Sequence, residues 1–284
     1  MEKRNLGLFF SLPMGKRERD GLELSGVDLV MLVKAHAAQD MPYLRDRKIR
    51  TIVRLEESDY DRPDDAADFS SWLTIWKDYV WAVICGCEPE NRFKWHYGSR
   101  DWGNRTNDKG DNPVRRHARA VERMRLIAQW QKVRFCSPGW THRDPGMAFG
   151  PAPDEGPQPG FYPWIEDTRN AYDACTYNCD HIYPWDGSDY DIRERYMRKL
   201  NQVVASRHKE VILDEVNVRD NRLTTEEHMA RTLNIATATL PIQRVIAMFP
   251  FVMNGDPAGG GWSPKQLMNS TECYRQVRDW RSAN

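Results

Sequence analysis

The sequence predicts a parallel α/β fold of the (β/α)8 barrel type, on three observations. Eight short apolar runs, rich in Val, Ile and Phe, recur along the 284 residues. Most of these runs lack a strict alternation of polar and apolar residues, which is typical of strands covered on both faces of a parallel sheet. The segments between them carry the start signals of helices, and alternating strands and helices indicate a parallel α/β fold. Eight such strands in a chain of this length favour a closed barrel over an open sheet.

The expected strands follow one another at intervals that leave room for a helix after most of them. They cover residues 7–11, 27–33, 50–55, 79–86, 133–137, 180–185, 210–216 and 244–252. Four helix starts can be read between and after them, from proline at the first helical position or from a capping pair. These signals are Asn112-Pro113, Ser188 with Asp191, Thr224 with Glu227, and Ser263-Pro264.

One segment, at about residues 138–164, is dense in proline and glycine and resembles a linker between domains. A division there would leave five strands on one side and three on the other, and neither piece could close a barrel. We therefore expect a single (β/α)8 domain over residues 1–284. The segment is then a long loop after the fifth strand, at the rim where such folds carry function.

Composition excludes several classes of function. The chain has 41 basic and 41 acidic residues, so no excess of positive charge predicts binding to nucleic acid or to an anionic membrane. No stretch approaches the 18 apolar residues of a membrane span, and the first residues lack the pattern of a secretory signal. We expect a cytoplasmic protein, with release by a route such as cell lysis as the alternative. The oligomeric state is not predicted.

The six cysteines do not resemble the disulfide framework of a small secreted domain. Cys175 and Cys179, with His181 close by, are spaced differently from a zinc knuckle, and no second ligand pair follows them. We expect reduced, mostly buried thiols, no metal and no cofactor.

Two glutamates follow expected strands at the end of the barrel where active sites lie. Glu88 comes after the fourth strand and Glu215 ends the seventh. Paired carboxylates are what glycoside hydrolysis requires, one protonated to assist the leaving oxygen and one ionised at the anomeric carbon. Glu90 is the alternative candidate to Glu88 for one of these two carboxylates, and Asp214 is the alternative to Glu215 for the other. Strand alternation would point Asp214 and Glu215 to opposite faces, so a shift of one residue would exchange them.

The strand-four ending Gly86-Cys87-Glu88-Pro89 is similar to the Gly-Asn-Glu-Pro of the retaining (β/α)8 glycoside hydrolases, a superfamily that the chain resembles over its whole barrel. The resemblance implies that Glu88 is the acid/base and Glu215 the nucleophile. Cys87 stands where the family has an asparagine that contacts the sugar 2-hydroxyl. A thiol is a poor substitute for an amide, so this departure concerns substrate binding.

Further parts of the resemblance concern residues around the nucleophile. His181 and Tyr183 resemble the family's strand-six His-x-Tyr, which implies that Tyr183 hydrogen-bonds the nucleophile and His181 lines the floor of the site. Arg54 resembles an inward arginine that keeps the nucleophile ionised. Trp262 is a candidate for the family's strand-eight tryptophan, although the strand itself has no clean match.

Eleven tryptophans are an unusual number for a chain of this length. Five fall in expected helices or strands and are predicted to pack: Trp72, Trp76, Trp81, Trp130 and Trp280. The other six follow strands on the expected rim: Trp95, Trp102, Trp140, Trp164, Trp185 and Trp262. Indole faces pack well against sugar rings, and among these Trp140, Trp185 and Trp262 are the candidates for substrate binding.

The sequence thus predicts a glycosidase that acts on an oligo- or polysaccharide by a retaining double displacement with two glutamates. Two alternatives belong to other classes. A carbohydrate-binding barrel without catalysis would account for Cys87 in place of asparagine. A metal-dependent barrel hydrolase would need clustered ligands, and the seven histidines are scattered. Neither the sugar, nor the linkage, nor internal as against terminal cleavage can be read from the sequence.

Overall fold

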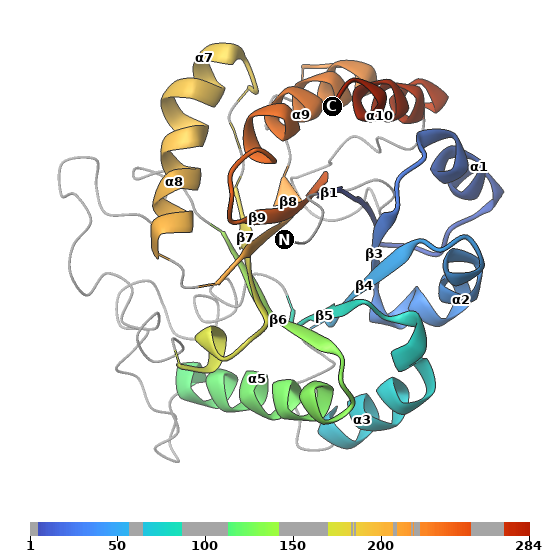
Figure 1. Ribbon diagram of the computed structural model, residues 1–284, viewed down its shortest axis with the longest axis vertical. Coiled ribbons are helices and arrows are strands. Elements are labelled where there is room, and N and C mark those ends of the chain that lie inside the picture. The colour runs from blue at the N-terminus through green and yellow to red at the C-terminus, as the bar shows by residue number, and fades with distance from the viewer. Residues whose placement is uncertain are drawn as a thin grey trace.

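A computed structural model describes residues 5–56, 65–86, 113–141, 170–182, 184, 186–206, 209–216, 218, 222–250 and 270–284. Figure 1 shows a ring of strands at the centre with helices around its outside. The strands are β1 (Asn5–Leu6), β2 (Leu8–Phe10), β3 (Leu29–Val33), β4 (Arg50–Arg54), β5 (Ala82–Ile84), β6 (Arg134–Thr141), β7 (Tyr177–His181), β8 (Val211–Val216) and β9 (Val245–Pro250). The α-helices are α1 (Lys16–Ser25), α2 (Lys34–Asp46), α3 (Asp65–Trp76), α5 (Pro113–Trp130), α7 (Asp189–Asp191), α8 (Met197–Ser206), α9 (Thr225–Thr239) and α10 (Thr271–Ala283). A 3-10 helix, η2 (Lys77–Tyr79), and a π-helical segment, η3 (Ile192–Tyr196), complete the described elements.

All neighbouring strands are parallel, in the order β1-β9-β8-β7-β6-β5-β4-β3-β2. The two ends of this order are consecutive in the chain, because Gly7 alone separates β1 from β2. The Gly7 amide donates to the carbonyl of Met248 in β9 over 2.9 Å. One interrupted strand therefore joins β9 to β3 and closes the ring, which confirms the predicted (β/α)8 barrel.

The strands show no alternation of polar and apolar residues because both of their faces are covered. In β3, Leu29, Met31 and Val33 belong to a cluster that fills the barrel interior. Val30 and Leu32 belong to a larger cluster between the sheet and the helices. A strand buried on both sides has no polar face, and this explains the continuous apolar runs.

Three of the predicted helix starts lie in the described residues and are confirmed. α5 begins at Pro113. The Ser188 hydroxyl accepts from the Asp191 amide at the start of α7, and Thr224 forms a complete capping box with Glu227 before α9. The prediction for the last described helix is wrong. α10 begins at Thr271 and is capped by the Ser270 hydroxyl, so Ser263-Pro264 precedes it and lies outside the described residues.

Three predicted boundaries also differ from the structure. β5 is shorter than residues 79–86 because Tyr79 ends a 3-10 helix. β7 covers 177–181 rather than 180–185, so it ends at His181. β6 continues to Thr141, into the start of the predicted loop, because a register shift between Cys136 and Gly139 accommodates Pro138 within the strand. Residues 142–164 of that loop lie outside the described residues.

The five cysteines of the described residues are buried and form no disulfide, as predicted: Cys85, Cys136, Cys175, Cys179 and Cys273. Among the described helices, none combines the length and the apolar character needed to cross a membrane.

Candidate active site

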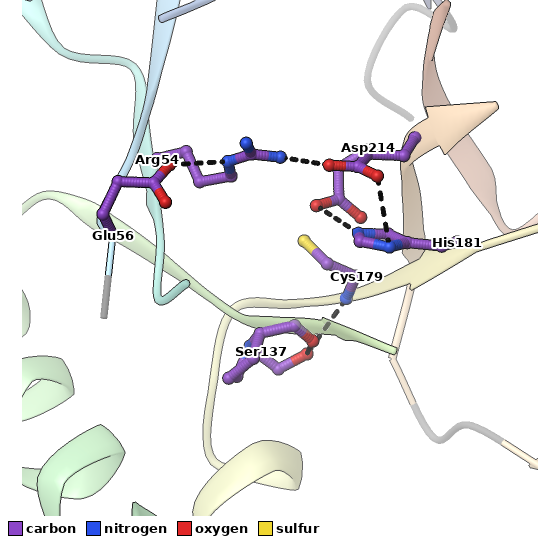
Figure 2. Close-up of polar contacts among 8 residues, drawn as sticks. Arg54, Glu56, Ser137, Cys179, His181 and Asp214 are labelled. Carbon is purple, nitrogen blue, oxygen red and sulfur yellow. Dashed lines mark hydrogen bonds and ion pairs between the residues drawn. The ribbon is translucent and has the colours of Figure 1, made fainter. Parts of the chain in front are cut away.

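Charged side chains from three strands meet at the carboxyl ends of those strands (Figure 2). Arg54 is the last residue of β4, His181 is the last of β7, and Glu215 is the last but one of β8. Each is at most 6% exposed. Three predicted site residues, far apart in sequence, therefore come together at the end of the barrel where enzymes of this fold hold their active sites.

Arg54 supplies the positive charge of the cluster. It shares the inward face of β4 with Ile52, which belongs to the barrel interior, and its guanidinium lies 4.5 Å from the centre of the Phe9 ring. Its Nη1 donates to Oε1 of Glu215, and its Nε lies 3.4 Å from Oε1 of Glu56. The buried carboxylate of Glu215 is thus paired with a cation, which a charge removed from water requires.

His181 lies between two carboxyl groups. Its Nε2 is 3.1 Å from Oδ2 of Asp214, and its Nδ1 is 3.5 Å from Oε2 of Glu215. The imidazole is fully buried. The structure thus brings His181 into contact with Glu215, while its predicted role in lining the floor of the site stays a prediction.

Asp214 and Glu215 both reach the imidazole, so the expectation that they point to opposite faces is wrong. The reason is an irregularity in β8. Asp180 pairs with Leu213, whereas the next residue of β7, His181, pairs with Glu215, so Asp214 is an extra residue in the ladder. A bulge of this kind breaks the alternation and turns two consecutive side chains toward the same side.

Asp214 is the most unusual ionisable group of the cluster. It is fully buried, and its Oδ1 accepts no hydrogen bond from the described residues. Burial raises the pKa of Asp214 above its ordinary value, while the charge and the hydrogen bond of His181 act in the opposite direction. A carboxyl in this position holds its proton more tightly than one in water.

Gly139 on β6 leaves the space that this arrangement needs. A Cβ atom at this position would lie 2.2 Å from Nε2 of His181 and 2.7 Å from both carboxyl oxygens of Asp214. Next to it, the Ser137 hydroxyl accepts a hydrogen bond of 3.0 Å from the Cys179 amide, where the bulge interrupts the β6–β7 ladder (Figure 2). The Ser137-Pro138-Gly139 segment thus positions His181 and Asp214 from the neighbouring strand.

Two residues that shape the described cluster were not selected from the sequence. In the sequence, Asp214 is only the alternative candidate to Glu215, and Gly139 is only part of the expected loop. Gly139 could have been noticed, because a glycine within a strand often marks the close approach of another group. The bulge that recruits Asp214 has no signal in the sequence.

Several predicted site residues lie outside the described residues, so their roles stay predictions: Cys87, Glu88, Tyr183, Trp185 and Trp262. The competitor Glu90 lies there too. Trp140 falls within β6, where it pairs with Asp180 of β7 through the backbone.

Four of the five tryptophans predicted to pack do so. Trp72, Trp76 and Trp280 contact the cluster between sheet and helices, and Trp81 stacks on Tyr177 at 5.8 Å between ring centres. The prediction for Trp130 is wrong, because this last residue of α5 is 81% exposed.

Within the described residues, no group of three or more His, Cys, Asp or Glu side chains is arranged to hold a metal ion.

The sequence matches no protein-family model and no curated protein. Solved structures similar to this chain include several glycoside hydrolases. An endo-β-1,3-glucanase of family GH128, subgroup II, from Sorangium cellulosum has a TM-score of 0.63 at 14% identity, covering 96% of this chain and 98% of its own. A mutant GH128 subgroup I endo-β-1,3-glucanase from Amycolatopsis mediterranei, in complex with laminaripentaose, has a TM-score of 0.58 at 11% identity, covering 96% and 99%.

A family 39 glycoside hydrolase from Bacteroides cellulosilyticus has a TM-score of 0.58 at 10% identity, covering 99% of this chain and 64% of that one. At these identities the likeness establishes a shared fold, in agreement with the barrel described above.

Proposed function

We propose that this protein is a retaining glycoside hydrolase acting on β-1,3-linked glucans. The observation that carries the proposal is Glu215, a carboxylate 2% exposed and held by Arg54 and His181 at the carboxyl end of β8. A buried carboxylate without a catalytic task is costly even when it is paired. A site for the anomeric carbon gives it a task, because oxocarbenium-like transition states require a fixed negative charge nearby.

The substrate class comes from the similar structures. Two of them act on β-1,3-glucans, and one is in complex with laminaripentaose. They share this fold over nearly their whole length, so a glucan-binding rim is the first substrate hypothesis to test. The zero net charge of the chain agrees with a neutral polymer that is bound by stacking and hydrogen bonds.

In the proposed reaction, the Glu215 carboxylate attacks the anomeric carbon while Glu88 gives its proton to the leaving glycosidic oxygen. A covalent glycosyl ester on Glu215 results. Glu88, now ionised, takes a proton from a water molecule, which attacks the anomeric carbon and releases Glu215. Arg54 balances the negative charge of Glu215 before attack and after release.

The position of β5 agrees with this role for Glu88. Ile84, the last residue of β5, pairs in register with Arg54, so the chain leaves β5 at the level of the charged cluster. Glu88 follows shortly afterwards in sequence. Retention requires the two carboxyl groups to lie roughly 5–5.5 Å apart.

The test measures release of reducing ends from laminarin, and of products from laminaripentaose, by the full chain and by single Gln variants. We expect Glu215→Gln and Glu88→Gln each to lower activity by at least about 10³-fold, whereas Glu90→Gln, as a matched control, stays near wild type. If Glu90→Gln loses activity and Glu88→Gln does not, the acid/base is Glu90. Full activity of Glu215→Gln would exclude the mechanism.

Proton NMR of the first product distinguishes retention from inversion, because a retaining enzyme releases the β-anomer from a β-linked glucan. The same preparation distinguishes catalysis from binding alone. Calorimetric binding of laminaripentaose without turnover over a long incubation would favour the non-catalytic barrel. Assays on a wider panel of polysaccharides in place of laminarin then test the substrate class separately from the reaction.

A further inference from the structure

Asp214 is a buried carboxyl that the proposed reaction does not use. It is fully enclosed and contacts Nε2 of His181, the ring nitrogen that does not face Glu215. Its one hydrogen-bonding contact among the described residues is the 3.1 Å contact from Oδ2 to Nε2 of His181. Burying such a group is costly, so His181, its partner within the described part of the chain, indicates its role.

The geometry restricts where protons can lie. An ionised Glu215 only accepts hydrogen bonds, so the Nδ1 facing its Oε2 at 3.5 Å must carry hydrogen to be attracted to it. Nε2 then has two favourable states. It either carries hydrogen and donates to an Asp214 carboxylate, or it accepts from a protonated Asp214. In both states one proton lies between Nε2 and Oδ2.

We propose that Asp214 is a positioning residue, which shares one proton with Nε2 of His181 and thereby keeps the Nδ1–H of His181 directed at Glu215. The proposal rests on the proposed function only in taking Glu215 as the nucleophile. Asp214 acts through His181 and does not touch the substrate. Its effect is to hold the Glu215 carboxylate in one orientation, between Arg54 on one oxygen and His181 on the other.

The charges around the pair support a shared proton. Arg54 and Glu215 carry opposite charges, so a pair that holds one proton leaves these four buried side chains with no net charge. A neutral buried cluster is far less costly than one with an unpaired ion. Glu56, two residues after the end of β4, also faces Arg54 and is partly exposed.

Among the described residues, Cys179 on β7 is a further titratable group that interacts electrostatically with Asp214, and it also interacts with Cys136 on β6 and Asp180 on β7. Burial raises the pKa of Cys179 well above that of an ordinary thiol, so this group stays neutral and does not compete for the proton. The raised pKa of Asp214 agrees with a carboxyl that retains a proton in place.

The test reads the proton positions directly, by ¹⁵N NMR of the histidine rings in the full chain. The signals of His181 are assigned by their loss in His181→Gln. We expect Nδ1 of His181 to be protonated in the wild type from pH 5 to pH 8. We expect Asp214→Ala to lose this preference and to show an unprotonated Nδ1 in part of the molecules. An unprotonated Nδ1 in the wild type, or an unchanged pattern in Asp214→Ala, would overturn the proposal.

Asp214→Asn is the conservative variant, because its amide can donate to Nε2 as a protonated carboxyl does. We expect it to keep Nδ1–H and to retain more activity than Asp214→Ala. If Asp214→Asn instead behaves like Asp214→Ala, a shared proton is not the cause, and the proposal fails. Asp214→Asn also remains informative if Asp214→Ala does not fold.

The matched control is Asp40→Asn. Asp40 is buried to a similar degree, but it contacts the Met14 amide and Arg19 away from the cluster. It should leave the His181 signals and the activity per folded molecule unchanged. A change in the His181 signals of this control would mean that loss of any buried carboxylate has the same effect.

Kinetics on laminarin form the second readout. We expect Asp214→Ala to lower kcat by between about 10-fold and about 10⁴-fold, with little change in KM. The upper figure is the loss of kcat in a Ser-His-Asp triad whose histidine is held in the wrong tautomer. An unchanged kcat would overturn the positioning role. If the wild type hydrolyses no glucan, the proposed function fails, and the NMR measurement still decides where the proton lies.

Discussion

The two sides of the barrel differ in the regularity of their strand pairing. From β2 to β6, four successive pairings keep an unbroken register. From β6 to β9, each of the three pairings contains a register shift. Within the described residues, the irregular side carries His181, Asp214, Glu215 and Gly139, and the regular side contributes Arg54 and Glu56 to the cluster.

The difference shows how one barrel combines a packed interior with a polar site. On the regular side, strict alternation sends apolar residues such as Met31 and Ile52 inward, layer upon layer. On the irregular side, shifts in register redirect side chains near the strand ends, so that two consecutive acidic residues meet one imidazole. Bulges are known to redirect side chains next to active sites, and four predictions test whether they do so here.

The largest effect is expected at the main connection between the two sides. Arg54→Met removes the cation that pairs with Glu215 and leaves a buried carboxylate uncompensated. We expect the free energy of unfolding to fall by about 3–5 kcal/mol, measured by chemical denaturation at neutral pH, and activity on laminarin to fall with it. Arg54→Lys keeps the charge but not the planar fork, so its loss should be intermediate. Equal stability of Arg54→Met and the wild type would contradict the pairing.

A smaller effect is expected for Gly139→Ala on the irregular side. The added methyl group overlaps Nε2 of His181 and the carboxyl of Asp214, so the strands must move apart. We expect a loss of about 1–3 kcal/mol in unfolding free energy, as for other overpacked sites, together with a changed ¹⁵N spectrum of His181.

Gly15→Ala is the matched control for an added Cβ. Its nearest neighbour would be the terminal carboxylate of Glu18, a flexible group that can move away. If Gly139→Ala and Gly15→Ala lower the unfolding free energy by the same small amount, the space at Gly139 does not limit the size of the side chain.

On the regular side, Ile52→Val deletes one methylene from the apolar interior two residues before Arg54. We expect a loss of about 0.5–1.5 kcal/mol in unfolding free energy and no change in kcat per folded molecule. A changed pH profile of kcat/KM would show that the apolar interior and the charged cluster are coupled, and would weaken the distinction between the two sides.

The smallest effect concerns the pH dependence of stability. Because burial raises the pKa of Asp214 above its ordinary value of 3.8, the native chain binds this proton more tightly than the unfolded chain. The stabilising contribution is therefore complete below the unfolded pKa and is lost as pH rises through the raised folded pKa. Asp214→Asn cannot ionise.

We therefore expect the unfolding free energy of Asp214→Asn, relative to the wild type, to increase as pH rises from 3.8 through the folded pKa. Denaturation curves at a series of pH values measure this difference, in which the titrating groups that do not interact with Asp214 cancel. A constant difference across the range would mean that burial does not shift the pKa of Asp214.

Local chemistry explains what could be predicted. Apolar runs, proline at the start of a helix, and the Thr224–Glu227 capping box depend on neighbours within a few residues, so strands and helices could be located from sequence. The inward position of Arg54 agrees with alternation along β4, whose pairing with β5 is regular, whereas His181 follows a register shift in β7 and was expected from the resemblance of its motif. Boundaries failed where a distant contact decides them, as in β6, which continues past Pro138 because β7 pairs with it beyond the shift.

The sequence by itself predicted the barrel from its alternating strands and helices, and the resemblance of its motifs predicted that Arg54, His181 and Glu215 lie at one end of it, because motifs and chain order are local properties. Only the tertiary structure decided that Asp214 joins them and that Gly139 makes room for it. Both depend on the register between neighbouring strands. That register is set by the packing of the whole sheet, and a shift of one residue in it leaves no trace in the sequence of either strand.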